Sequence, residues 1–282
     1  MASGTKPTTV EYIQHHLANN CIKLEGSGYC EPGGFMQLHL DTIGFAVLLG
    51  ALLVLVGWRV TRQASILRPV GMQNFFEIII EFVQNQIGDV YKKPNSWIGP
   101  IAITAFCWIW LMNFMDLIPV DLLPLLAQII TGDSHTKLKV VPTTDPNATL
   151  GMALAVFGMI TYYNIKSKGF LGFIKMFLFH PFGKYAVPFN VIMTLVEEIA
   201  KPLSLGLRLF GNLFAGELVF LLIALIGGTL VTGVVSAIGW GFIQVLLDFA
   251  WLAFHILVIT LQAFVFMVLT IVYISMADDS GH

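Results

Sequence analysis

Residues 203–231 read LSLGLRLFGNLFAGELVFLLIALIGGTLV, and this apolar stretch of 29 residues decides the fold. Arg208 and Glu217 are the only charged residues in it. A lone arginine in the middle of a membrane costs from about 3 to more than 10 kcal/mol. Of the 282 residues in the chain 56% are hydrophobic and 11% charged, whereas soluble domains carry about 25% charged residues. The composition predicts a polytopic membrane protein, and the net charge of −2 gives no sign of nucleic-acid binding.

A second long apolar stretch, residues 241–276, contains Asp248 and His255 as its only ionisable groups apart from Tyr273. Straight helices over the two stretches would be roughly 43 and 54 Å long, whereas the hydrocarbon core of a bilayer is only about 30 Å thick. We therefore expect two long, strongly inclined helices that form a C-terminal hairpin over residues 188–276. Helix breaks in the glycine-containing segment 227–244 are the alternative.

The first two-thirds of the chain predicts three further membrane elements. Residues 43–60 are about long enough to span a bilayer, and the arginines after them place the preceding N-terminal segment outside and the C-terminus in the cytoplasm. Residues 74–93 combine apolar positions at helical spacing with three acids, which is typical of an amphipathic helix at the membrane surface or against a partner. Residues 97–165 predict a transmembrane hairpin, and its outer loop, 121–148, is mostly polar.

The whole chain, residues 1–282, thus predicts an all-α membrane protein with a single domain. Cys107 lies in an apolar run and is expected to be a small core residue. Cys21 and Cys30 either pair on an oxidising side of the membrane or remain free thiols. Neither a metal-binding spacing of cysteines nor a glycine-rich phosphate loop occurs in the sequence. We therefore expect no metal and no cofactor, and no ATP chemistry on this chain.

Polar residues gather around Arg208 on one face of the first long helix. At about 100° per residue, they lie within about 40° of Arg208. The residues that share this face are Glu197, Lys201, Ser204 and Asn212. Glu217 follows Arg208 by nine residues, so it lies about 180° away and roughly 13 Å along the helix. The two residues cannot form a salt bridge within their own helix, so Arg208 needs water or an acid from another helix or chain.

The second long helix carries a polar stripe of its own. Asp248, His255 and Gln262 recur every seven residues, with a drift of only about 20° per step. Histidine is the side chain best suited to pass protons near neutral pH, and a glutamate in apolar surroundings can also exchange protons there. Glu217 and His255, on the two arms of one hairpin, are therefore candidates to face each other in a hydrated crevice.

Purely structural roles remain open for most of these residues. Helix packing, interhelical hydrogen bonds or a place at the membrane surface would explain them without any transport. These alternatives concern Arg208, Glu217, His255, Asn212, Ser204, Gln262, Asp248 and Lys201. Asp116 lies beside a proline that ends a helix, and it is more readily explained as a residue that caps or anchors a turn.

The two long stretches resemble the signature helices of subunit a of the bacterial F-type ATP synthase. The resemblance rests on KPLSLGLRLFGNLFAGELVFLLIAL at 201–225 and AFHILVITLQAFVFMVLTIVYISMA at 253–277. The segments WLMNFMDLIPVDLLP at 110–124 and EYIQHHL at 11–17 are similar to the same family. The resemblance implies a non-catalytic stator subunit in a bacterial inner membrane. Its partners would be the ring of c subunits, the peripheral-stalk subunit b, the rest of the F1F0 ATP synthase and membrane lipid.

The resemblance also implies roles for individual residues. Arg208 would be the essential arginine that attracts ring carboxylates and separates two offset half-channels, which conduct protons. The residues that match the proton route are Glu217, Asn212, His255 and Gln262. Residues implied less directly, as possible half-channel lining, are Ser204, Lys201, Glu197, Glu198, Asp248 and Asp116. A glutamate common in relatives is Thr194 here, and Glu197 and Glu198, about one helical turn further on, are candidates to replace it. The connection at 227–244 looks longer than in close relatives.

Two other classes of function compete with this interpretation. A secondary transporter would be expected to show inverted repeats and interrupted helices in matching halves, and neither pattern is visible in the sequence. A purely structural membrane scaffold gives no reason to keep Arg208, Glu217 and His255 together in apolar surroundings. Purification beside a ring of c subunits would distinguish both from a stator subunit.

Overall fold

The computed structural model describes residues 21–23, 37–65, 71–91, 97–118, 122–123, 128–129, 132, 139–179, 182–183, 186–230 and 234–278. Most of the described residues are helical. By length and composition, five of the described helices can cross a membrane. They are Leu40–Arg62, Ile98–Leu117, Pro146–Phe179, Val187–Ile223 and Ile238–Asp278. The chain is therefore a multi-pass membrane protein of the all-α class.

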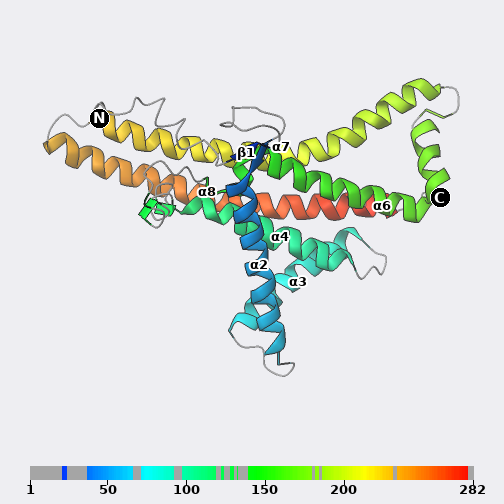
Figure 1. The fold of residues 1–282 in the computed structure, drawn as a ribbon, viewed down its shortest axis with the longest axis horizontal. Helices are drawn as coiled ribbons and strands as arrows, with labels where there is room; N and C mark the ends of the chain where they lie inside the picture. Colours follow the sequence, from blue (N-terminus) through cyan, green and yellow to red (C-terminus); the bar gives the residue numbers. More distant parts are fainter. Residues whose placement is uncertain are drawn as a thin grey trace. The chain divides into compact units, whose positions relative to one another are not determined.

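The elements follow one another as Figure 1 labels them, with helices near the positions expected from the sequence. The N-terminal part holds β1 (Cys21–Lys23), β2 (Gln37–His39), α2 (Leu40–Arg62) and α3 (Met72–Val90). The middle part holds α4 (Ile98–Phe114), the 3₁₀ turns η1 (Met115–Leu117) and η2 (Pro142–Thr144), and α6 (Pro146–Phe179). The C-terminal part holds the two longest helices, α7 (Val187–Leu230) and α8 (Val234–Asp278).

The chain divides into two compact units, and several helices contribute a part to each. Unit 1 comprises Met1–Ala51, Trp110–Asp145 and Gly211–Thr260, and unit 2 comprises Leu52–Ile109, Pro146–Phe210 and Leu261–His282. A single domain over residues 1–282 stays a prediction, as does the inclination of α7 and α8 to the membrane.

In unit 1 the second part of α7 packs against the first part of α8. The ring centroids of Phe220 and Trp251 lie 6.3 Å apart, and those of Phe220 and His255 lie 5.4 Å apart. Gly216 lies against the same imidazole, because a Cβ added there would be 2.8 Å from His255 Nδ1. The absence of a side chain at residue 216 therefore lets the two helices approach closely.

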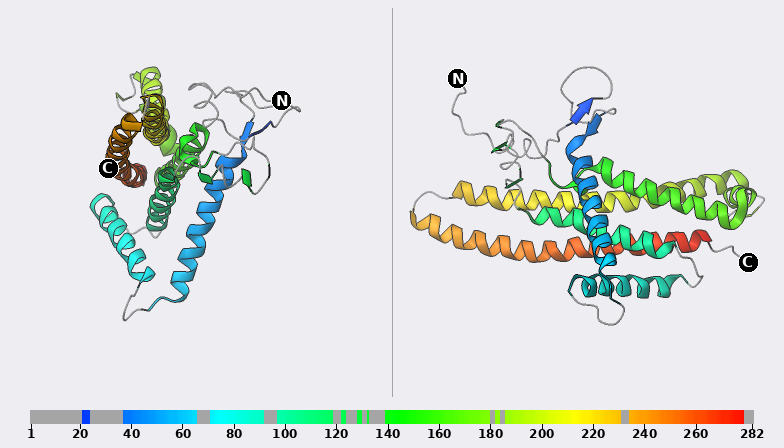
Figure 2. Two further views of the ribbon diagram at one scale, coloured as in Figure 1. Left: turned by 90° about the vertical axis from the view of Figure 1, so that its left-hand side faces the viewer. Right: turned by 60° about the horizontal axis from the view of Figure 1, so that its bottom comes forward.

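In unit 2 the C-terminal end of α3 is hydrogen-bonded to the C-terminal end of α8, and Figure 2 shows these helices. The hydroxyl of Tyr91 donates to Asp278 Oδ2 over 2.5 Å, and Ser275 Oγ donates to the carbonyl of Val90 over 3.2 Å. The buried amide of Asn190 donates to the carbonyls of Leu178 and Gly183. This amide ties the start of α7 to the chain that follows α6.

The structure refines several expectations about the elements. Among the described residues of the segment 227–244, α7 continues to Leu230 and α8 begins at Val234. Residues 231–233 lie outside the described residues, so the alternative of a helix break there stays open. The inward helix expected to end at residue 165 runs on to Gly169, where a φ of 71° and a ψ of 162° interrupt the helical backbone, and a second helical segment of α6 follows up to Phe179. The expected outer N-terminal segment contains a short antiparallel pair, in which Cys21 lies opposite His39.

The continuity of α7 through Pro202, which the helical arithmetic assumed, is present in the structure. A proline in a helix interior lacks the N–H for the backbone ladder, but neighbouring helices make this tolerable in membrane helices. Cys107 is buried, as expected. Cys30 lies outside the described residues, so its pairing with Cys21 stays open.

Candidate functional site

Helix α7 has one buried and one exposed face, and they separate Arg208 from Glu217. A buried stripe recurs every four residues or so along the helix. Its members are Asn190, Thr194, Glu198, Leu205, Leu209, Leu213, Glu217 and Leu221. The exposed face holds Ser204, Arg208 and Asn212, the residues that helical spacing placed together. Lys201 is half-buried and Glu197 exposed, so these two lie at the margin of that face.

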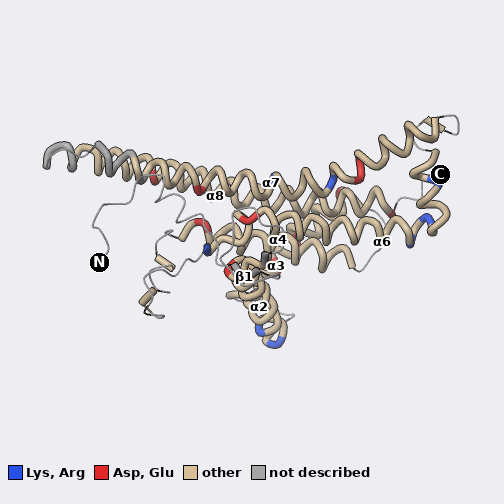
Figure 3. Tube along the Cα trace, turned by 45° about the horizontal axis from the view of Figure 1, so that its top comes forward, with Lys and Arg blue, Asp and Glu red and all other residues tan. Residues whose placement is uncertain are grey.

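Charged residues are few along the two long helices, as Figure 3 shows. Among the described residues, Arg208 has no ion-pair partner. Its guanidinium is exposed, whereas the Glu217 side chain is only 4% exposed. Because a guanidinium keeps its charge at all relevant pH values, α7 presents a permanent positive charge beside Ser204 and Asn212 on its exposed face.

A buried histidine–aspartate pair forms the centre of the polar groups in unit 1. His255 Nε2 on α8 lies 2.5 Å from Asp116 Oδ2 on η1, and the two side chains are 1% and 3% exposed. The rings of Phe220 and Trp251 pack around the imidazole. One turn before Asp116, the amide of Asn113 is fully buried, and neither of its polar atoms has a hydrogen-bond partner in the described part of the chain. Buried polar side chains thus occur within the apolar interior of unit 1.

The pair with Asp116 was not expected from the sequence, which explained this residue as a turn anchor and proposed Glu217 as the partner of His255. Gly216, the neighbour of Glu217, and Phe220 are α7 residues that lie against the imidazole. Whether Glu217 faces His255 stays a prediction. Asn113 was missed altogether, although its place one helical turn before Asp116 in the sequence MNFMD is a signal that helical spacing offers.

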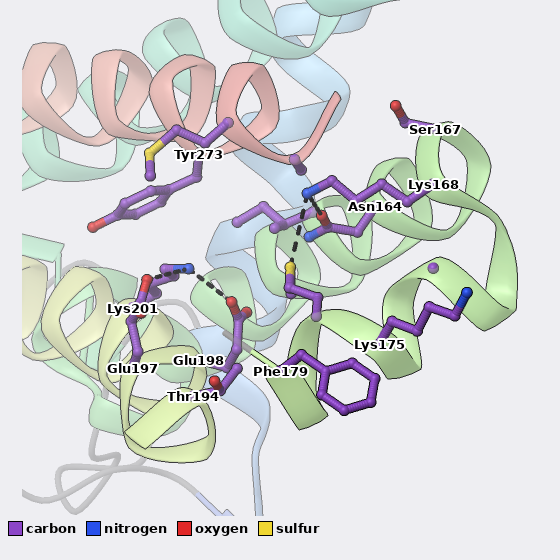
Figure 4. A pocket seen from close by; sticks show the side chains of 15 residues that line it. Asn164, Ser167, Lys168, Lys175, Phe179, Thr194, Glu197, Glu198, Lys201 and Tyr273 are labelled. Atoms are coloured by element: carbon purple, nitrogen blue, oxygen red, sulfur yellow. Dashed lines mark hydrogen bonds and ion pairs between the residues drawn. The ribbon is translucent and has the colours of Figure 1, made fainter. Parts of the chain in front are cut away.

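A polar pocket of about 750 Å³ lies in unit 2, between α6, α7 and α8 (Figure 4). Lys201 reaches into it and binds two carboxylates: its Nζ is 2.7 Å from Glu198 Oε1 and 3.1 Å from Glu197 Oε1. Glu198 is buried, whereas the Glu197 side chain is 63% exposed. Lys168, from α6, donates to Asn164 Oδ1 over 3.1 Å. The pocket therefore holds a carboxylate and two ammonium groups away from most of the solvent.

The sequence predicted part of this pocket. Helical spacing placed Glu197 and Lys201 on one face of α7, and the structure brings them together with Glu198. The sequence did not predict the residues that α6 and α8 contribute to the pocket wall, Asn164, Lys168 and Tyr273, because they are far from Lys201 along the chain. Thr194 also lines the pocket, so Thr194, Glu197 and Glu198 share one cavity.

The remaining candidate residues lie along α8. Gln262 is buried and belongs to unit 2, whereas Asp248 is half-buried and belongs to unit 1. Within the described ranges, no group of three or more histidine, cysteine or acidic side chains could hold a metal ion.

These features define a class of protein: a multi-pass membrane protein with a permanent charge on one exposed helix face and buried titratable side chains in its interior. The profile of the family described as ATP synthase A chain matches residues 43–275. The chain is 48% identical over 290 residues to ATP synthase subunit a 2 of Hahella chejuensis, which covers 98% of this chain and 99% of that relative. It is 44% identical over 314 residues to ATP synthase subunit a of Saccharophagus degradans, with 99% of each chain covered.

A third relative, ATP synthase subunit a of Pseudomonas fluorescens, is 47% identical over 291 residues, with 98% of this chain and 99% of the relative covered. The chain therefore belongs to the ATP synthase A chain family. As a member of this family it is a non-catalytic membrane subunit of a proton-translocating ATP synthase.

Proposed function

We propose that this chain is the stator that couples proton flow to the rotation of a ring of c subunits. The exposed face of α7 is turned toward the ring, and Arg208 attracts each passing ring carboxylate in its ionised form. Because Arg208 stays charged, it blocks direct proton transfer between two offset half-channels. A lysine in its place could lose its proton and open a leak.

The observation that carries this proposal is the opposite exposure of Arg208 and Glu217 on one continuous helix. Exposing a guanidinium on a membrane helix is costly, unless another chain supplies a carboxylate or the site is hydrated. A carboxylate on a moving ring provides such a partner. Glu217 lies on the buried face of α7. A residue on that face is suited to a proton path inside the subunit rather than to contact with the ring.

The outer half-channel is proposed to run through the buried polar groups of unit 1. A proton from outside passes Glu217, His255 and Asp116, with Asn113 as a further lining residue, and then neutralises a ring carboxylate. Imidazole and carboxylate in direct contact can hold and release a proton without a large energy cost, because each charged form has a partner. Histidine is a poor ligand for sodium, so the proposed coupling ion is the proton. Asn212, on the ring-facing side, and Gln262 are proposed to line the route.

The second half-channel is proposed to use the pocket of unit 2. After nearly a full turn, the ring carboxyl group loses its proton toward the cytoplasm through the region of Glu197, Glu198 and Lys201. The ammonium group of Lys201 lies 2.7 Å from Glu198 Oε1 and holds this buried carboxylate in the wall of the pocket. Because residue 194 is a threonine here, Glu197 and Glu198 are proposed to take over the role in proton release that a glutamate at this position would have. Ser204 and Asp248 are assigned to the lining only.

The proposed orientation and partners follow from the same assignment. The N-terminus lies outside the inner membrane and the C-terminus lies in the cytoplasm, in agreement with the lysines and arginines that follow the first and third spans. The subunit contacts the c-ring and the peripheral-stalk subunit b within the F1F0 assembly. Proton flow toward the cytoplasm turns the ring and drives ATP synthesis in the soluble head.

Cysteine cross-linking tests the ring-facing side of α7. In a variant without the native cysteines Cys21, Cys30 and Cys107, we expect Ser204→Cys to form disulfides with cysteines placed beside the ring carboxylate. The matched control is Leu213→Cys, because Leu213 is fully buried on the other face of the same helix. Cross-linking through residue 213 and none through residue 204 would refute the proposed orientation of α7.

A further inference from the structure

The second helical segment of α6 carries large apolar side chains on its outer side. Phe170, Leu171 and Ile174 are all exposed, and the exposed Lys175 follows them directly. Exposed aromatic and aliphatic residues next to a lysine are typical of a helix that lies in the headgroup region of a bilayer. The interruption of the helical backbone at Gly169 separates this segment from the first one. The second segment is therefore suited to the membrane surface, beside the end of the first segment.

Both segments of α6 contribute to one wall of the polar pocket in unit 2. Lys168, from the first segment, extends into the pocket, and Lys175 comes from the second segment (Figure 4). The two segments are close here, because a Cβ added at Gly172 would be 3.1 Å from Lys168 Cβ. At about 100° per residue, Lys175 lies about 60° from Gly172 and about 40° from Leu171. Lys175 thus stands between the pocket and the exposed apolar side of its segment.

The side chain of Lys168 is half-buried, and its described partners are neutral. Its Nζ donates to Asn164 Oδ1 over 3.1 Å and lies 3.7 Å from Met176 Sδ. An ammonium group has three donors, and a thioether is only a weak acceptor. Lys168 can therefore still donate to a stronger acceptor that reaches this wall of the pocket.

An anion is the acceptor that this wall suits best. Within the described ranges, neither Lys168 nor Lys175 forms an ion pair. The carboxylates of Glu197 and Glu198 line the same pocket, but both are bound by Lys201 on α7. Charge-assisted hydrogen bonds to a phosphate are stronger than those to a neutral acceptor, and they compensate an ammonium group that is partly removed from water. The α6 wall is therefore complementary in charge to a phosphate group.

We propose that Lys168 and Lys175 bind the phosphate group of an anionic phospholipid at the α6 wall of the pocket. The acyl chains of this lipid lie along the exposed apolar side of the second segment, beginning at Leu171. Basic pockets between transmembrane helices bind anionic lipid headgroups. The exposed apolar side chains favour a lipid over a free phosphate ion, because a free ion would leave them in contact with water. The inference goes beyond the proposed function and is independent of it, because lipid binding requires no proton flow.

The alternative is a purely structural role, in which Lys168 only holds the bend of α6 through its contacts with Asn164 and Met176. Lys175→Gln distinguishes the two roles, because Lys175 is exposed and takes no part in those contacts. The substitution is therefore expected to leave folding and assembly unchanged. Lys168→Gln removes the half-buried charge itself.

Lys166 on the same helix offers a matched control. Its side chain is exposed, and its ammonium group lies 5.8 Å from the centroid of the Tyr162 ring. Lys166 is not part of the pocket wall. Lys166→Gln thus removes the same charge from the same helix without changing the proposed site.

The experiment uses the whole purified synthase in a neutral detergent and a phosphatidylglycerol that carries a photoreactive group beside its phosphate. After illumination, mass spectrometry identifies the labelled peptide and measures its amount over a range of lipid concentrations. We expect the label within residues 164–179. The apparent affinity should be about fivefold weaker in Lys175→Gln and in Lys168→Gln, which corresponds to about 1 kcal/mol per lysine. Lys166→Gln should be labelled like the native synthase.

Competition identifies the source of the phosphate group. Unlabelled phosphatidylglycerol should displace the probe, whereas phosphatidylcholine and inorganic phosphate at the same concentration should not. The inference is overturned if the label lies outside α6, or if Lys175→Gln is labelled like the native synthase. It is also overturned if phosphatidylcholine or inorganic phosphate competes as well as phosphatidylglycerol. An equal loss of affinity in Lys166→Gln would contradict it too, because that result indicates a general attraction to surface charge.

Discussion

His255 Nε2 lies 2.5 Å from Asp116 Oδ2, although 139 positions separate the two residues in the chain. Both side chains are buried, so each is the principal polar neighbour that the structure shows for the other. A buried pair of this kind is far more sensitive to the loss of one partner than to the loss of both, because a single truncation leaves the other group without compensation. A comparison of single and double substitutions can therefore detect the interaction between His255 and Asp116.

Substitution of His255 by alanine is expected to slow ATP-driven proton pumping by roughly a hundredfold, the lower end of the range for loss of a positioned proton-transfer group. The loss should remain smaller than that caused by substitution of Arg208. Pumping is measured as quenching of a pH-sensitive dye in inverted membrane vesicles, with the amount of assembled synthase as the reference. A rate within about twofold of the native one would contradict a role of His255 in the path.

A double-mutant cycle tests the pair itself. Asp116→Asn and His255→Ala are each expected to lower the free energy of unfolding, by about 3 kcal/mol if the remaining group stays buried and charged. The double variant should lose clearly less than the sum of the two single losses, because neither group is then left alone. Additive losses would mean that the two side chains do not interact.

Gly216 provides a steric test of the position of the imidazole. A Cβ added at residue 216 would lie 2.8 Å from His255 Nδ1, so Gly216→Ala must displace the ring. We expect slower pumping, although alanine is the better helix former by about 1 kcal/mol. Gly158→Ala on α6 is the matched control, since a Cβ there meets nothing within 4 Å. Equal pumping by the two variants would contradict the close packing of residue 216 on His255.

The two glutamates that bind Lys201 are predicted to differ in importance. Glu198→Gln should slow pumping several-fold, because it removes a buried carboxylate from the pocket and leaves the half-buried ammonium group with an exposed partner. Glu197→Gln should have little effect, since exposed ion pairs contribute about 0–1 kcal/mol. Pumping rates of the two variants in the same vesicles provide the comparison. The reverse order would assign the function to the exposed residue.

The change of direction in α6 depends on a conformation that favours glycine. Gly169 has φ 71° and ψ 162°, and other residues adopt this region at a cost of about 1–3 kcal/mol. Gly169→Ala is therefore expected to lower thermal stability and the amount of assembled subunit in the membrane. Gly158→Ala, within the regular part of the same helix, should do neither. Native stability of the Gly169 variant would show that the bend tolerates a side chain.

Apolar stretches and helical spacing were sufficient to predict the long helices and the two faces of α7. Both properties are local: each residue adds about 100° to the helix, so the separation of Arg208 and Glu217 follows from counting. The lysines after residue 165 indicated the end of a membrane span, and the first helical segment of α6 does end close by, at Gly169. The second segment, which follows up to Phe179, was not expected from the sequence.

Contacts between distant segments could not be predicted in this way. The partner of His255 is Asp116, and the polar pocket joins Lys201 to Asn164 and Tyr273 from other helices. Such pairs depend on how helices pack, and nothing in the spacing of residues along one helix specifies its neighbour. The antiparallel pairing of Cys21–Lys23 with Gln37–His39 was also not predicted, because strands of only three residues give no clear alternating pattern in the sequence.

The central claim is that Arg208 meets the ring carboxylates and prevents a direct proton leak. The most direct measurement is proton pumping by vesicles that carry Arg208→Ala, with ATP hydrolysis by the same vesicles measured after uncoupling. We predict that pumping is abolished while the soluble head still hydrolyses ATP, and that the assembled membrane sector leaks protons once the head is removed. Pumping at the native rate in this variant would contradict the account.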